Sequence, residues 1–252
     1  MVIDAHIHPV VDAETDFSRF VATGDFEAQV ETLRRAGMDR ACGALVARTP
    51  FNAFAPVRQL NDHALRLRDR FPDFYIPGVQ VHPGYAEESC AELERLHREG
   101  VRWVGELVGY IFGYGEEYAS PRALAVMRTA AALGMVVNLH CGSLEVVDAL
   151  ARAVPELPIV LAHPGDGEAF LSRIALVARH PNLHLDISGT GIDRYGMIRR
   201  AMDAAGKHKI LLGSDYPVNN PAVYLEGARF EPLRADEFEA LCSGNFLRLI
   251  GG

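Results

Sequence analysis

The sequence lacks the features that mark several specialised classes of protein. Its four cysteines (Cys42, Cys90, Cys141 and Cys242) are far apart and form no C-x-x-C pair, so we expect neither a disulfide framework nor a thiolate-rich zinc site. No apolar run approaches the length of a membrane span, and the first residues have neither the basic nor the long apolar segment of a targeting peptide. We therefore expect a cytoplasmic protein with reduced thiols and no membrane partner.

Positive charge is also scarce. Lysine and arginine together number 25, against 33 aspartates and glutamates, which gives a formal net charge of −8. Nucleic-acid-binding proteins need a basic face, and no cluster of arginine or lysine lies beside the motifs described below. We therefore expect a small-molecule substrate and no nucleic-acid partner, and a homo-oligomer is possible in principle.

The chain has no low-complexity tract, internal repeat or linker, which predicts a single domain over residues 1–252. Hydrophobic residues make up 49% of it, enough for a large core. Eight short runs are nearly continuous in Val, Ile, Leu and Ala, a pattern typical of strands buried on both faces of a parallel sheet. These runs cover residues 2–8, 40–47, 74–82, 101–108, 135–142, 157–164, 182–189 and 209–217.

Segments with helical spacing separate the apolar runs. Ser120 and Pro121 form an N-cap followed by proline at the first helical position, and Gly134 ends the same helix. Eight strands alternating with helices in about 250 residues predict a (β/α)8 TIM barrel. An open doubly wound sheet is the alternative, but no G-x-G-x-x-G follows the first run. The other expected helices cover residues 26–37, 87–98, 144–153, 167–179, 193–205 and 235–249.

Side chains that can bind a metal end strand after strand. In a barrel the carboxyl ends of all strands open on one rim, where active sites are built, and histidines two apart on a strand point to the same face. Imidazole and carboxylate donors together suit zinc, manganese, iron or cobalt. The residues at these expected strand ends are His6, His8, His82, Glu106, His140, His163 and Asp215.

This pattern resembles the amidohydrolase superfamily. The ending GNFLRLIG (244–251) also resembles the closing helix of the amidohydrolase 2 branch. The resemblance covers most of the chain and implies a metal-dependent enzyme, because the order from His-x-His to Asp is specific to the superfamily. The motifs that carry it, in order, are DAHIH (4–8), GEL (105–107), NLHCG (138–142), LAHPG (161–165) and GSDYP (213–217).

The resemblance also implies a role for each ligand residue. His6, His8 and Asp215 would bind the more buried metal, and Asp215 would also contact the attacking water. His140 and His163 would hold a second metal or the substrate.

Glu106 lies where relatives carry a bridging carbamylated lysine or a glutamate. It favours two ions, as in the TatD-like and phosphotriesterase-like arrangements, although many amidohydrolase 2 proteins use one metal. We therefore expect one or two divalent ions per chain, with zinc ahead of manganese, iron or cobalt.

Three further residues are candidates for contacting substrate. His82 begins the HPG that follows the third run, and it could touch substrate, orient a ligand or cap loop backbone. Arg48 follows the second run and could clamp a substrate carboxylate, although a solvated surface arginine is the alternative. Tyr110 belongs to the aromatic loop 109–118, which could form a pocket wall or pack on the barrel.

These residue types predict a metal-dependent hydrolase of a small amide, cyclic amide, lactone or ester. The metal would lower the pKa of a water molecule, Asp215 would accept and relay its proton, and His163 or His140 could polarise the carbonyl. The alternative is a metal-dependent decarboxylase of a small unsaturated or aromatic acid, because relatives in the amidohydrolase 2 branch use much the same ligands for that reaction. A TatD-like phosphoesterase and a non-catalytic metal-binding barrel are weaker alternatives.

Overall fold

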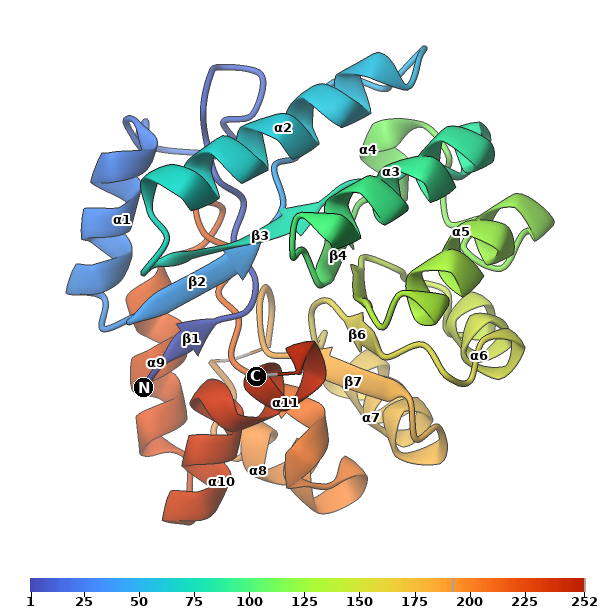
Figure 1. Ribbon diagram of the computed structural model, residues 1–252. Coiled ribbons are helices and arrows are strands. Elements are labelled where there is room, and N and C mark those ends of the chain that lie inside the picture. Colours follow the sequence, from blue (N-terminus) through green and yellow to red (C-terminus); the bar gives the residue numbers. More distant parts are fainter. Residues whose placement is uncertain (192, 252) are drawn as a thin grey trace.

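Eight parallel strands form the centre of the molecule. The computed structural model describes residues 1–191 and 193–251, and each strand pairs with the next in sequence order, with helices packed around the outside (Figure 1). The predicted (β/α)8 TIM barrel in a single domain is therefore confirmed. The strands are β1 (Ile3–Asp4), β2 (Arg40–Gly43), β3 (Tyr75–Val79), β4 (Trp103–Leu107), β5 (Val136–Leu139), β6 (Ile159–Leu161), β7 (Leu183–Asp186) and β8 (Ile210–Leu211).

Single backbone hydrogen bonds, rather than a regular ladder, close the seam between the first and last strands. The amide of His8 donates to the carbonyl of Tyr216 at 2.7 Å, and the amide of Asp215 donates to the carbonyl of His6 at 2.8 Å. Ile7 and Tyr216 form an isolated parallel bridge at the same place. The segments that follow the first and last strands thus meet where three expected metal ligands lie.

The helices and helical turns cover the sheet and its base. The longer helices are α1 (Phe26–Arg35), α2 (Ala55–Arg70), α3 (Ala86–Arg98), α5 (Pro121–Ala132), α6 (Leu144–Ala153), α7 (Gly167–Arg179), α8 (Met197–Ala205) and α9 (Pro221–Phe230). The shorter elements are α4 (Gly109–Phe112), α10 (Ala235–Glu239), α11 (Asn245–Ile250), the 3-10 turns η1 (Pro83–Tyr85) and η2 (Lys207–Lys209), and the π turn η3 (Ala240–Gly244). None of the described helices combines the length and apolarity that crossing a membrane requires.

Two of the longer helices were not expected from the sequence. Helix α2 buries only four side chains among many charged ones, so its apolar period is weak. Helix α9 follows Asn219 and Asn220, a pair that favours a turn. The Asn220 side chain instead caps the helix by accepting from the amide of Ala222, with Pro221 at the first helical position.

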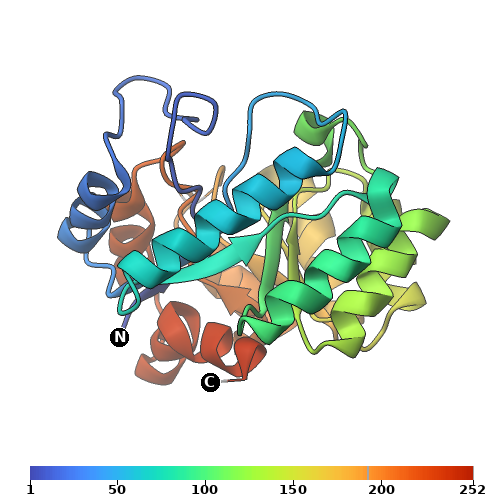
Figure 2. The ribbon, with the colours of Figure 1, turned by 45° about the horizontal axis from the view of Figure 1, so that its top comes forward.

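A small apolar cluster fills the base of the barrel. Trp103 and Phe246 pack there with ring centroids 5.2 Å apart, and α11 lies beneath the strands, at the bottom of Figure 2. The other members of this cluster are Ile3, Ala5, Cys42, Val136, Val160 and Leu211. The base is therefore filled with apolar side chains, and the polar residues at the strand ends face the opposite end.

Candidate metal centre

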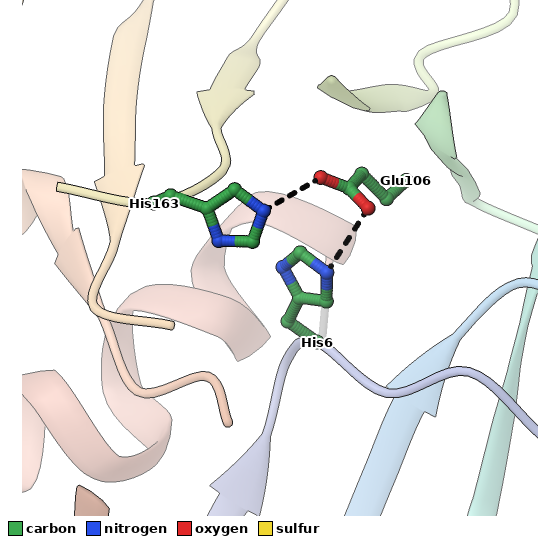
Figure 3. A group of neighbouring side chains, drawn as sticks. All are labelled: His6, Glu106 and His163. Carbon is green, nitrogen blue, oxygen red and sulfur yellow. Dashed lines mark ion pairs between the residues drawn. The ribbon is translucent and has the colours of Figure 1, made fainter. Parts of the chain in front are cut away.

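Glu106, in β4, is buried at the centre of a group of histidines, some buried and some partly exposed. Its Oε2 atom is 3.2 Å from Nε2 of His8 and 3.4 Å from Nε2 of His6. Its Oε1 atom is 3.2 Å from Nδ1 of His140 and 3.2 Å from Nε2 of His163. Figure 3 shows the carboxylate between His6 and His163, with one oxygen directed at each ring. The two oxygens of Glu106 thus face two different pairs of imidazoles.

Asp215, which follows β8, approaches the same group from the seam. Its Oδ1 atom lies 3.2 Å from Nε2 of His8 and 3.7 Å from Nε2 of His6, and its Oδ2 atom accepts from Asn219 at 3.1 Å. Asp215 and His163 have φ angles of 62° and 65°, the left-handed region that is uncommon outside glycine. Among the described residues, Asp215 and His163 are the non-glycine residues with positive φ, and both belong to this cluster. Strained backbone conformations of this kind are often found at functional sites.

Other hydrogen bonds fix how the histidine rings are oriented. Nδ1 of His6 lies 2.9 Å from Oδ2 of Asp186, and Nδ1 of His8 lies 3.1 Å from the carbonyl of Ala44. The hydroxyl of Ser188 is 3.0 Å from Nδ1 of His163. When Nδ1 carries the proton in these contacts, Nε2 is left with a lone pair directed at the carboxylates. Such outer partners commonly orient metal-binding histidines.

Asp186 was missing from the residues expected in the site. It ends β7 and is fully buried, and its carboxylate also accepts from Asn138 Nδ2 at 3.1 Å and from the amides of His163 and Ser188. The run 182–189 alternates four buried polar residues with two leucines and an isoleucine, so Asp186 does not stand out in it as the ligand that ends a strand. Its ending in aspartate at the rim was the signal available in the sequence.

Buried carboxylates govern the charge of the histidines. Burial disfavours the cation of His8, but hydrogen bonds to Asp215 and Glu106 outweigh it and raise the pKa of His8 to about 9. Burial opposes the cation of His6 too, and the charges of Asp186 and Glu106 raise its pKa well above the ordinary value. Burial would raise the pKa of Glu106, but the histidines around it lower that pKa well below its usual range. Protons on histidines therefore compensate these carboxylates.

The same atoms fit a divalent cation. Nε2 of His6 is buried and has no hydrogen-bond partner among the described residues, because its contacts with carboxylate oxygens are longer than good hydrogen bonds. Ligand atoms of His6, Glu106 and His163 lie within 4.8 Å of one another, as do those of His6, His8 and Asp215. Nitrogen and carboxylate donors of this kind suit zinc, manganese, iron or cobalt.

The cluster forms part of the lining of a pocket of about 470 Å³. That volume lies within the usual range of small-molecule sites. Tyr110, expected to contact substrate, also lines it, and its ring packs edge-on against His140 with centroids 5.2 Å apart. The other cluster members in the lining are His8, Glu106, His163 and Asp215.

The structure places the other two expected substrate contacts outside the lining. The Arg48 guanidinium donates to the carbonyl of Asp16 at 2.8 Å and lies over the ring of Phe17, so its position fits the alternative of a surface arginine. Both ring nitrogens of His82 contact backbone groups: Nε2 lies 3.1 Å from the carbonyl of Phe112, and Nδ1 accepts a hydrogen bond from the amide of Gly84. His82 therefore caps loop backbone instead of pointing at a ligand.

Solved structures with the same fold include named decarboxylases. The 5-carboxyvanillate decarboxylase LigW from Sphingomonas paucimobilis aligns with a TM-score of 0.72 and 16% identity over 99% of this chain and 98% of that chain. The 2,6-dihydroxybenzoate decarboxylase from Rhizobium aligns with a TM-score of 0.76 and 16% identity over 99% and 98%.

A third structure, 5-carboxyvanillate decarboxylase LigW2 from Novosphingobium aromaticivorans, contains bound manganese. It aligns with a TM-score of 0.72 and 15% identity over 89% of this chain and 80% of that chain. At these identities the likeness concerns the fold. No curated protein matches the sequence significantly.

The family model for amidohydrolase 2, described as amidohydrolase, matches residues 3–252. This match spans the strand-end histidines at the N-terminus, the central glutamate and the aspartate after the last strand. The sequence resemblance and the site geometry agree with it, and the chain belongs to the amidohydrolase 2 family.

Proposed function

We propose that this protein is a metal-dependent decarboxylase of a small unsaturated or aromatic acid. The observation that carries the proposal is the set of imidazole and carboxylate donors around the buried Glu106, most of which line one pocket. Membership of the amidohydrolase 2 family supports a metal-dependent enzyme. Solved structures of the same fold that are named as decarboxylases, one with manganese, support the reaction and make manganese a candidate beside zinc.

Decarboxylation requires a proton to be delivered as CO2 departs. The bond between the carboxyl carbon and its neighbour breaks, its electron pair stays on the neighbouring carbon, and a proton must be added there. A divalent cation held by these donors would stabilise negative charge on a substrate oxygen. Asp215 and His163 both line the pocket, so either can hold the proton that reaches the carbon. The remaining histidines and Glu106 keep these groups oriented.

Hydrolysis of a small amide, cyclic amide, lactone or ester is the second candidate function. The observation that favours it is the position of Glu106, whose two oxygens face different pairs of histidines as a carboxylate bridging two ions would. In this reaction Asp215 would accept a proton from the attacking water and pass it to the leaving group. The two candidates therefore use the same residues and differ in the bond that breaks.

The experiment begins with metal content and continues with product analysis. Protein purified without chelator or a metal-affinity tag is analysed by elemental mass spectrometry, and is also reconstituted with Mn²⁺ or Zn²⁺. It is then tested for CO2 release from hydroxybenzoates and unsaturated acids, and for opening of lactones, esters and cyclic amides. We expect CO2 release, and about one ion per chain would agree with that reading.

Asp215→Asn is the variant that connects the activity to this site. It should retain the fold and lower the rate by about 10² to 10⁴-fold, the usual contribution of a positioned acid or base. Asp69→Asn, at an exposed residue paired with Arg68, is the matched control and should leave the rate unchanged. Two ions with lactone or amide cleavage and no CO2 would instead assign the hydrolase function, and failure to bind any metal would refute both candidates.

A further inference from the structure

The pocket contains a guanidinium that the proposed chemistry does not use. Arg173, within α7, lines the pocket, and it donates to the carbonyl of Ala162 at 3.3 Å and to that of Cys141 at 3.1 Å. Ala162 directly precedes His163, and Cys141 directly follows His140. The guanidinium is therefore held beside the ends of β5 and β6, next to two residues of the metal cluster.

Among the described residues, no carboxylate is paired with this cation. In the part of the chain that the structure describes, Arg173 forms hydrogen bonds to carbonyls and takes part in no ion pair. The nearby carboxylate of Glu116 is already engaged, because its oxygens accept from the amides of Gly142 and Ser143 at 2.6 and 2.9 Å. Burial lowers the pKa of Arg173. A partly buried cation is costly unless an anion pairs with it.

The surroundings of Arg173 leave room for such an anion. The pocket has a volume of about 470 Å³, and Gly142, Gly165 and Ala162, which contribute to the same lining, add little side-chain volume to it. A guanidinium has five N–H donors in a planar fork, and the two carbonyls do not use them all. Arg19 also lines the pocket, but it is exposed, so water already solvates its charge.

We propose that Arg173 binds a carboxylate of the substrate other than the group that reacts, so that the substrate is a small molecule with a second acid group. A reacting carboxylate loses its charge as it becomes CO2, and pairing it with a cation would stabilise the ground state more than the transition state. A carboxylate that keeps its charge is bound equally well throughout, and the planar fork suits it. The inference deepens the proposed function and holds for either candidate reaction, because it concerns the part of the substrate that is not cleaved.

The test measures binding without turnover. Calorimetry on the Mn²⁺-loaded protein compares benzoate with benzene-1,3-dicarboxylate and benzene-1,4-dicarboxylate. The wild type should bind at least one diacid more tightly than benzoate. Arg173→Met should weaken the binding of that diacid by about 10- to 100-fold, because the contact between the guanidinium and the second carboxylate is lost. The binding of benzoate, which has no second carboxylate, should weaken by less than about threefold. Arg173→Lys should recover part of the preference, and Arg179→Met, an exposed residue of the same helix, should keep all of it.

The ratio of the affinity for the diacid to the affinity for benzoate distinguishes loss of carboxylate recognition from damage to the fold, because a distorted pocket would bind both compounds more weakly. If Arg173→Met does not fold, Arg173→Lys and Arg173→Gln supply the same comparison. An unchanged ratio in the variants, or no diacid preference in the wild type, would overturn the inference while leaving metal content and CO2 release untouched. If inorganic phosphate displaces the diacid at comparable concentration, the site binds phosphate, and the proposal that Arg173 binds a substrate carboxylate is wrong.

Discussion

Nδ1 of His6 lies 2.9 Å from Oδ2 of Asp186, and Nε2 of the same ring faces Glu106 and Asp215. The Asp186 carboxylate is anchored by Asn138 and by backbone amides, so it holds the ring in one orientation. The aspartate thus determines which nitrogen of His6 is available to a metal.

Asp186→Asn should therefore weaken metal binding without removing any ligand. The asparagine keeps the volume of the side chain but loses the charge that orients and polarises His6. We expect metal affinity to fall by about 10- to 100-fold, measured by competition with a chromogenic chelator. Asp148→Asn, in a partly exposed cluster with Arg152 and His180, is the control and should bind metal normally. Wild-type affinity in Asp186→Asn would mean that His6 is oriented by the barrel alone.

Glu106→Gln tests whether the central carboxylate bridges two ions. If it does, bound metal should fall from about two equivalents toward one, because an amide is a poor bridging ligand. Elemental mass spectrometry gives the stoichiometry. Glu92→Gln serves as the control, since Glu92 is equally buried but is paired with Arg95 outside the pocket. Unchanged stoichiometry together with full activity would exclude the bridging role.

Metal binding should become stronger as pH rises toward 9. The pKa of His8 is raised to about 9 in the metal-free protein, so below that pH a metal must displace its proton. We expect the apparent Kd for Mn²⁺ to fall by about tenfold per pH unit for each proton displaced. Titration calorimetry in buffers with different ionisation enthalpies counts these protons. A Kd that does not change with pH would indicate neutral histidines.

The same pKa affects the stability of the metal-free protein. A raised pKa means that the His8 cation favours the folded state, fully below its ordinary value of 6.5. This contribution to the free energy of unfolding should be lost as pH rises through about 9. Bound metal should remove the dependence, because the histidine is then held neutral.

Phe246→Ala should destabilise the barrel base without changing the site. Phe246 is buried against Trp103 in the apolar cluster at the base of the barrel. Truncating a buried phenylalanine costs about 3 to 5 kcal/mol, to be measured by urea unfolding. Phe230→Ala, at a residue that is 79% exposed, should change stability by less than about 0.5 kcal/mol. Metal content should be normal in both variants, and a loss of metal in Phe246→Ala would mean that the base supports the site.

The fold could be predicted because buried parallel strands produce apolar runs in the sequence, and here these runs end in polar residues that can bind a metal. All eight runs contain a strand, and Glu106 and Asp215 were found because each stands at such an end. Helix α2 was not predicted because its buried face is narrow and its other faces are charged. The π turn that divides the last helical segment has no pattern of its own.

The substrate side of the pocket was harder to predict, because it depends on where loops and helices turn. Arg48 follows a strand at the rim, but its guanidinium donates a hydrogen bond to the carbonyl of Asp16 instead of lining the pocket. Arg173 lies within a helix, where sequence position gives no hint of the rim, yet it reaches the pocket beside Cys141. Long side chains span such distances, so strand-end position alone identifies ligands better than it identifies substrate contacts.

The seam of the barrel has a consequence for folding. His6 and Asp215 are roughly 200 residues apart in sequence but meet through the backbone as well as in the cluster. An ion held by His6, His8 and Asp215 would bridge the two sides of this seam. Because it would bind the folded chain and not the unfolded one, its binding free energy would add directly to the stability of the closed barrel. Completing this ligand set and closing the barrel would then be a single event in folding, because both require β1 and the segment after β8 to lie side by side.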